Sequence, residues 1–156
     1  RDPERLELEV TETLMLHDVE EAIRQLNALK KLGVRISLDD FGTGYSSLSY
    51  MNQLPLDKVK IDRSFVTGLM SDTKSQTLIT GISALGRVLD LTVVVEGVET
   101  LLELHRLMKH TQVDQVQGYL FSKPLDADTE GGLLKPKSSA LREMLASIPD
   151  ARKQAA

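Results

Sequence analysis

The sequence contains no cysteine and no tryptophan, and only 4% of its residues are aromatic. Without cysteine the chain can form no disulfide and offers no thiolate for chemistry, so we expect it in a reducing cytoplasm. Its apolar runs, such as the three valines at 93–95, are far shorter than the roughly 20 residues that span a bilayer, and we expect no membrane segment. A net charge of -4 without a long basic run gives no reason to expect binding to a nucleic-acid polymer.

The composition is that of an ordinary globular domain. The chain has 156 residues, of which 41% are hydrophobic and 27% are charged, and this length is enough for one domain with a core. It begins with Arg1 rather than with Met, so we expect a fragment or a processed form of a longer protein.

The hydrophobic pattern alternates between the period of a strand and the period of a helix. Strands are predicted at 6–12, 34–38, 57–62, 91–96 and 113–117, and helices at 18–32, 45–53, 72–89 and from residue 100. The apolar stripes predicted to be buried are Leu78, Ile82, Leu85 and Leu89 on one helix, and Leu101, Leu104, Leu107 and Met108 on the last. Strands that alternate with helices indicate an α/β fold with a parallel sheet and helical crossovers.

One face of the predicted sheet is mainly apolar, and the other is polar. The polar face ends in Glu9, Asp39, Lys60, Glu96 and Gln117, each near the carboxyl end of its strand. An open doubly wound sheet tends to be apolar on both faces, whereas a β/α barrel gathers inward polar groups at this end. We therefore expect a partial TIM-type (β/α) barrel of about five strand-helix units; either the sheet stays open or the missing strands come from elsewhere.

Two adjacent carboxylates, Asp39 and Asp40, end the second strand and precede the loop Phe41, Gly42, Thr43 and Gly44. Like charges this close are stable when a cation lies between them, and hard oxygen ligands suit Mg or Mn. Glu9 is a third acid for the same metal site. Taken alone, Asp39 and Asp40 are equally expected to cap the helix after the loop.

Two further residues of the polar face suit hydrolysis. Lys60 can balance the acids or hold a nucleophilic water, and Glu96 can accept a proton from that water. Two divalent ions would help such a water to attack a phosphodiester.

Each residue also has a plainer interpretation: Lys60 as the partner of one acid, and Glu96 as part of a surface turn at 96–100 that leads into a capped helix. For Glu99, a surface position is favoured; Gln117 can bond to its neighbours, and Glu12 can be a solvated acid.

Five ordered motifs resemble the signatures of the EAL domain family. They are LELEVTE at 6–12, DDFGTGYSSL at 39–48, VKIDRSF at 59–65, EGVET at 96–100 and VQGYLFSKP at 116–124. The family comprises cyclic-di-GMP phosphodiesterases of bacterial signalling proteins, and its fold is a modified TIM barrel.

The resemblance implies specific roles. Glu9 and Asp39 would bind one metal ion, and Asp39 and Asp40 a second; Lys60 and Glu96 would position and deprotonate the attacking water. Glu99 and Gln117 would support the site and the substrate, and Glu12 would steady the loop that begins at Asp39. The reaction would open cyclic-di-GMP to linear pGpG with two Mg or Mn ions.

The sequence also departs from the family pattern. The Glu-Ala-Leu strand, whose glutamate is a metal ligand, and an asparagine ligand are both absent, and we expect them upstream of residue 1. Residues 1–135 would then be the carboxyl-terminal part of an EAL domain, with a short helix and a flexible tail in 136–156. We expect weak or no hydrolysis by the fragment itself; the alternative is a non-catalytic cyclic-di-GMP-binding or protein-interaction module. An unpaired edge strand at 6–10 predicts a homodimer or a swapped oligomer.

Overall fold

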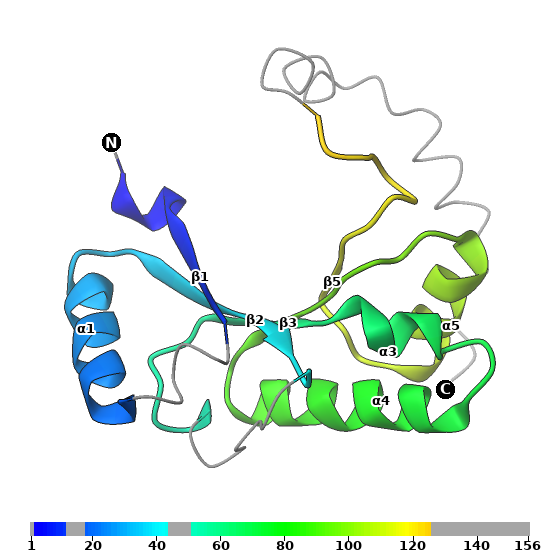
Figure 1. Ribbon diagram of the computed structural model, residues 1–156, viewed down its shortest axis with the longest axis horizontal. Helices are drawn as coiled ribbons and strands as arrows, with labels where there is room; N and C mark the ends of the chain where they lie inside the picture. The colour runs from blue at the N-terminus through cyan, green and yellow to red at the C-terminus, as the bar shows by residue number, and fades with distance from the viewer. Residues whose placement is uncertain (1, 12–17, 44–50, 126–156) are drawn as a thin grey trace, which may run out of the picture.

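The computed structural model describes residues 2–11, 18–43 and 51–125. Its centre is one parallel sheet in which the spatial order of the strands is their order along the chain (Figure 1). The strands are β1 (Glu7–Thr11), β2 (Arg35–Phe41), β3 (Lys58–Ile61), β4 (Thr92–Val95) and β5 (Gln115–Val116). The predicted α/β fold with a parallel sheet is thus confirmed.

The helices begin where the sequence places capping residues. They are α1 (Val19–Lys31), α3 (Arg63–Thr67), α4 (Thr73–Val88) and α5 (Leu101–His110), together with the 3-10 helix η1 (Pro3–Arg5). The side chains of Asp18, Asp72 and Thr100 each accept a hydrogen bond from a backbone N–H of the first helical turn. Thr100 and Glu103 form the complete reciprocal capping box.

The core lies between the sheet and the helices, and α1 and α4 lie on the same side of the sheet (Figure 1). Its strand residues are the outward apolar set Val10, Ile36, Leu38, Val59, Ile61, Val93 and Val95, all buried. The strand register places Glu9 beside Ser37 and Ser37 beside Lys58, so the polar residues share the opposite face as predicted. The packing of helices on one face leaves the other face free to form a site.

The second strand is longer than the predicted 34–38. β2 continues through Asp39 and Asp40 to Phe41, which pairs with Ile61 of β3. The register shifts between Leu38 and Phe41, so the strand bulges where the two acids lie. Pairing beyond the bulge is what extends the strand.

The predicted stripe of α4 is wrong at Leu78, which is 51% exposed, whereas Ile79 is fully buried. The buried line runs through Ile79, Ser83 and Gly86 because the helix approaches the sheet closely there. A Cβ on Gly86 would lie 2.3 Å from Cγ2 of Val93. The small residues Ser83 and Gly86 therefore determine which face of α4 packs against the sheet.

On α5 only the centre of the predicted stripe is buried. Leu104 and Leu107 are buried, whereas Leu101 and Met108 at the two ends are exposed. A helix of 10 residues that packs along a narrow line can cover only the side chains at its middle.

Besides β2, two further elements differ from the sequence prediction, and others fall outside the described residues. Helix α3 was not predicted, and β5 is shorter than 113–117. Most of the predicted helix at 45–53 lies in residues 44–50, which the structure does not describe. The same holds for Glu12, Gly44, the proposed boundary at 135/136 and the predicted short helix and tail.

Candidate active site

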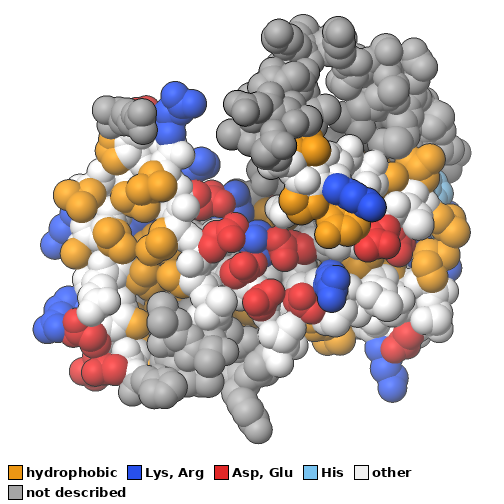
Figure 2. All heavy atoms as spheres, turned by 45° about the horizontal axis from the view of Figure 1, so that its top comes forward, with side chains coloured by type: hydrophobic (Ala, Val, Ile, Leu, Met, Phe, Trp, Pro, Cys, Tyr) orange, Lys and Arg blue, Asp and Glu red, His pale blue; other side chains and the backbone are white. Residues whose placement is uncertain are grey.

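Lys60 lies at the centre of the polar face and is 6% exposed. Its Nζ forms ion pairs with three carboxylates: 2.8 Å to Glu9 Oε1, 3.0 Å to Asp39 Oδ1 and 2.7 Å to Glu96 Oε1. These partners come from β1, β2 and the segment that follows β4, so one lysine on β3 gathers acids from both sides of its strand. Figure 2 shows acidic side chains gathered near the middle of one face with a basic side chain among them.

The ion pairs decide the protonation of Lys60. Burial by itself would lower the pKa of its ammonium group, but hydrogen bonds to Glu9, Glu96 and Asp39 outweigh burial, and the pKa is raised well above its usual value. Lys60 is therefore a fixed cation at neutral pH. It can donate hydrogen bonds to a water or a phosphate oxygen, but it cannot act as a base.

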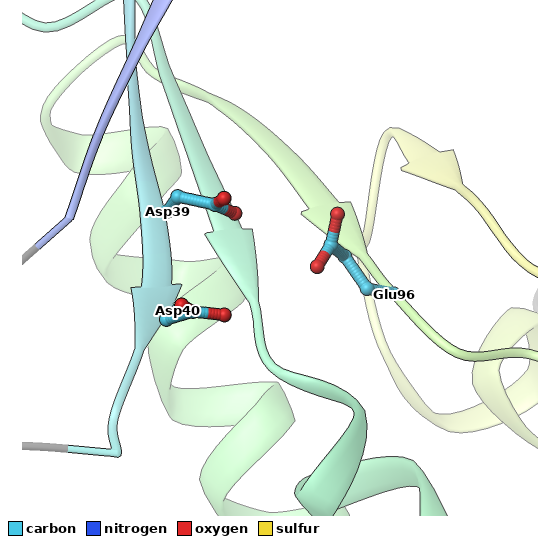
Figure 3. A group of neighbouring side chains, drawn as sticks. All are labelled: Asp39, Asp40 and Glu96. Atoms are coloured by element: carbon cyan, nitrogen blue, oxygen red, sulfur yellow. The ribbon is translucent and has the colours of Figure 1, made fainter.

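A second grouping shares two of these acids. Asp39, Asp40 and Glu96 each offer a carboxylate oxygen, and these three oxygens lie within 4.8 Å of one another. Figure 3 shows the three side chains reaching into the same space from either side of β3. Glu96, predicted to accept a proton, is thus close enough to Asp39 and Asp40 to bind one cation together with them. Glu9 is not in this group and pairs with Lys60.

The bulge in β2 explains how two adjacent residues reach one site. In a regular strand Asp39 and Asp40 would point to opposite faces of the sheet. Between Leu38 and Phe41, however, two residues of β2 stand opposite Lys60 alone. Asp40 has a φ of 54°, a left-handed conformation that aspartate tolerates better than most residues. The adjacent pair is therefore a consequence of local backbone geometry.

The donor set fits a divalent cation. Oδ1 of Asp39 is buried and lies 3.0 Å from Nζ of Lys60, and no other described residue donates a hydrogen bond to it. Three carboxylates, those of Glu9, Asp39 and Glu96, pair with one lysine, and the carboxylate of Asp40 lies near those of Asp39 and Glu96. This excess of negative charge and the hard oxygen donors are what Mg²⁺, Mn²⁺ or Ca²⁺ requires.

The remaining predicted residues lie around this centre. Glu99 is exposed, and its backbone N–H donates to Glu103. Gln117 is also exposed, and its backbone oxygen accepts a hydrogen bond from Val98 N at 3.1 Å. Phe41 is buried, while Gly42 and Thr43 are exposed. Among the described residues, the ion pairs of Lys60 are with Glu9, Asp39 and Glu96, and Glu99 is not one of its partners.

Sequence reasoning missed the capping residue of α3. The side chain of Asp62 accepts a hydrogen bond from Ser64 N, which starts a helix directly after the lysine strand. Burial alone would raise the pKa of Asp62, but hydrogen bonds from the Ser64 side chain and from the Ser64 and Arg63 backbone hold it below its usual value. The signal was present, because aspartate is one of the preferred residues at the position before a helix.

A parallel strand-helix sheet with a lysine-centred acidic site at the carboxyl ends of its strands defines a β/α-barrel type of protein. The model of the EAL domain family matches residues 1–124, and the chain belongs to this family. The fold is accordingly part of an EAL-type TIM barrel. Within the described residues, no helix combines the length and the apolar character needed to cross a membrane.

The chain is similar to proteins that are named as phosphodiesterases. The cyclic di-GMP phosphodiesterase NbdA of Pseudomonas aeruginosa is 46% identical over 120 residues, which cover 77% of this chain and 15% of that protein. The PaMucR phosphodiesterase in complex with c-di-GMP is 41% identical with a TM-score of 0.78, covering 83% of this chain and 52% of that one.

A second similar structure is a complex with a metal. Klebsiella pneumoniae BlrP1, in its pH 9.0 complex with manganese and cyclic-di-GMP, is 34% identical with a TM-score of 0.73. The match covers 80% of this chain and 31% of BlrP1. The chain therefore spans about half of the PaMucR structure and a much smaller share of NbdA.

Proposed function

We propose that this chain forms part of the catalytic site of a cyclic-di-GMP phosphodiesterase, which hydrolyses its substrate to linear pGpG with two Mg²⁺ or Mn²⁺ ions in the cytoplasm. The observation that carries the proposal is the buried Lys60, which pairs with Glu9, Asp39 and Glu96 at the carboxyl ends of neighbouring strands. The similarity to NbdA, PaMucR and BlrP1 supports the choice of substrate.

Glu9, Asp39 and Asp40 are the proposed metal ligands, and the carboxylate of Glu96 is close enough to those of Asp39 and Asp40 to bind a cation together with them. When bound, the ions supply positive charge that stabilises the phosphodiester oxygens in the transition state. The protein supplies the rest of the chemistry. Lys60 is held as a cation and orients the attacking water, while Glu96 accepts the proton that the water loses.

Hydrolysis then requires one bond to form and one to break. The water oxygen attacks phosphorus, and the bond from phosphorus to the ribose 3′ oxygen breaks. That oxygen takes up a proton from solvent, and Glu96 releases to solvent the proton that it accepted from the water. We propose that Glu99, Gln117 and Glu12 support the site or the substrate. The loop Phe41, Gly42, Thr43 and Gly44 would hold Asp39 and Asp40 in place.

The test is hydrolysis of cyclic-di-GMP in Mn²⁺ by the whole protein that contains this chain, with pGpG measured by chromatography. Glu96→Gln should lower the rate by at least about 100-fold, the usual scale for loss of a general base. Lys60→Met should lower it by about 100-fold or more, the scale for loss of a hydrogen-bond donor that orients or stabilises the reacting groups. Lys58→Met is the matched control, because Lys58 lies on the same face of β3 but pairs with Glu7 at 2.7 Å. Unchanged rates in both site variants would refute the proposal.

The chain by itself has a second candidate function, which is binding of cyclic-di-GMP or a protein partner without turnover. The observation that favours it is coverage, because the chain matches only about half of the PaMucR structure. We expect weak or no hydrolysis by the isolated chain. Calorimetry with the dinucleotide in Ca²⁺, beside a hydrolysis assay in Mn²⁺, separates the two: binding without hydrolysis identifies the module, and turnover at the rate of the whole protein refutes it.

We also propose that the isolated chain self-associates through the edge of its sheet, as a homodimer or a swapped oligomer. β1 has a neighbour on one side only, and Leu6 and Leu8 beside that edge are 61% and 38% exposed. Unpaired strand edges with apolar side chains favour association. A monomer by light scattering at high protein concentration would contradict this.

A further inference from the structure

The short helix α3 touches both segments that carry the candidate metal ligands. It follows β3, the strand of Lys60, and Figure 3 shows that Asp40 and Glu96 lie on either side of that strand. The two contacts are made at glycines with positive φ, where the backbone comes close enough to exclude a side chain.

The first contact supports the backbone after Asp40. Gly42 has a φ of 95°, and a Cβ built on it would lie 2.6 Å from Cζ of Phe65. The chain that leaves the bulge therefore rests directly on the edge of the Phe65 ring. No residue other than glycine fits there without movement, both because of the ring and because of the backbone conformation.

The second contact supports the backbone after Glu96. Gly97 has a φ of 73°, and a Cβ built on it would lie 2.3 Å from Cβ of Arg63 and 3.2 Å from its Cα. The obstacle is the backbone and the first side-chain carbon of the helix, which cannot swing aside. The segment after β4 is therefore fixed against the first residue of α3.

The helix itself is firmly placed. Val66 and the following Leu69 are 1% and 0% exposed in the core, and Asp62 caps the first turn. A rigid element thus separates two segments whose carboxylates repel each other. Lys60 pairs with Asp39 and Glu96, but among the described residues no cation pairs with Asp40. Attraction to the lysine therefore does not explain where Asp40 lies.

We propose that α3 is a positioning element for the metal site: Phe65 supports the backbone after Asp40 and Arg63 supports the backbone after Glu96, so that the helix sets the separation of the two acids. The inference rests on the proposed metal-dependent function. It assigns positioning roles to Phe65 and Arg63, and it explains why glycine is required at positions 42 and 97.

The experiment measures Mn²⁺ binding by calorimetry and thermal stability by melting, with the whole protein. Gly42→Ala and Gly97→Ala should each weaken Mn²⁺ binding by about 10-fold or more, the effect expected when the support of a ligand is disturbed. Gly81→Ala is the matched control, since no atom lies within 4 Å of the added Cβ. Gly86→Ala is the stability control, because its Cβ would meet Val93 on the face of the sheet that packs against the helices.

The controls separate positioning from loss of stability. Gly86→Ala should lower the melting temperature while Mn²⁺ binding by the folded protein stays unchanged. Gly81→Ala should leave Mn²⁺ binding unchanged and should not lower the melting temperature, because alanine is favoured over glycine inside a helix. Mn²⁺ binding by Gly42→Ala and Gly97→Ala equal to that of the unaltered protein would overturn the proposal. An equal loss of binding in Gly86→Ala would overturn it as well.

A metal-free readout keeps this inference distinct from the proposed function. If the unaltered protein binds no Mn²⁺, the proposed function fails, yet α3 can still be tested by crystal structures without metal. In Gly97→Ala we expect the Glu96 carboxylate to leave its contact with Nζ of Lys60, which is 2.7 Å in the unaltered protein. An unchanged contact would overturn the positioning role.

Discussion

Nζ of Lys60 lies 2.7 Å from Oε1 of Glu96, although the two residues are 36 positions apart and belong to different strand-helix units. The contact joins the proposed water-orienting cation to the proposed proton acceptor. It also holds Glu96 beside Asp39 and Asp40. The charge balance of the site therefore depends on this lysine.

Replacing Lys60 with methionine should destabilise the fold. The change leaves Glu9, Asp39 and Glu96 without their cation, and we expect a loss of roughly 1–3 kcal/mol in the free energy of unfolding, the usual scale for stranded polar groups. Because these carboxylates are partly exposed, the loss should stay below that of a fully buried ion pair. Urea denaturation measures it, and an unchanged midpoint would contradict the expectation.

The difference in the free energy of unfolding between the unaltered protein and Lys60→Met should depend on pH, because the pKa of Lys60 is raised. A group with a raised folded-state pKa contributes its full stability below its unfolded pKa, about 10.4 for lysine, and loses it as the pH rises through the folded value. The gap between the unaltered protein and Lys60→Met should therefore be constant from pH 7 to about 9 and should shrink only above about 10.4. A gap that closes near pH 8 would show that the lysine is not held as a cation.

Substitutions of Asp40 should separate the loss of metal binding from the effect of backbone strain on stability. Asp40→Asn, Asp40→Gly and Asp40→Ala all remove a carboxylate and should weaken Mn²⁺ binding. Only alanine adds strain at the φ of 54°, so it should cost roughly 1 kcal/mol more stability than asparagine. Asp90 is the control, since its φ is 57° and it lies away from the site: Asp90→Ala should lose the same stability and keep Mn²⁺ affinity.

Divalent metal should stabilise the protein by binding the folded state. At 100 times the dissociation constant, a single bound ion adds about 2.7 kcal/mol, which a melting curve detects. Mn²⁺ should therefore raise the melting temperature of the unaltered protein but not that of Asp39→Asn. Asp90→Asn, which removes an acid outside the site, should keep the full shift. Equal shifts in both variants would place the metal elsewhere.

Asp62 should make the free energy of unfolding depend on pH in the acidic range. Because its pKa is lowered in the folded protein, its contribution is present above the unfolded value of about 3.9 and is lost as the pH falls through the folded value. Asp62→Ala removes the cap of α3 and should cost about 1 kcal/mol at pH 7, with a smaller difference at pH 3. Asp62→Ser keeps a capping oxygen without a charge, so its stability relative to Asp62→Ala should vary less with pH.

The polar face of the sheet could be predicted because strand alternation is a local property. Once Glu9, Asp39 and Lys60 are placed on strands, their side is fixed by parity and by parallel register. The bulge could not be predicted, since it depends on the pairing of Phe41 with Ile61 on another strand. The error at Leu78 has a similar cause: the approach of Gly86 to Val93 selects the buried face of α4, and helical periodicity alone does not reveal it.

The grouping of Glu96 with Asp39 and Asp40 was also beyond the sequence. Periodicity placed Glu96 at the correct end of the correct face, but which carboxylates share one cation depends on distances across β3. Those distances are set by side-chain packing between segments that are remote in the chain.

Because the strands lie in the sheet in their order along the chain, the ion pairs of the site can form only in a fixed order during synthesis. Glu9 and Asp39 leave the ribosome before Lys60, and Glu96 follows it, so the first two acids have no cation to join until β3 is added. The first ion pairs of the site thus form when the middle strand is added, and Glu96 joins them only after β4. A nascent chain that stops before residue 60 carries the repulsion between Glu9 and Asp39 without Lys60 to relieve it.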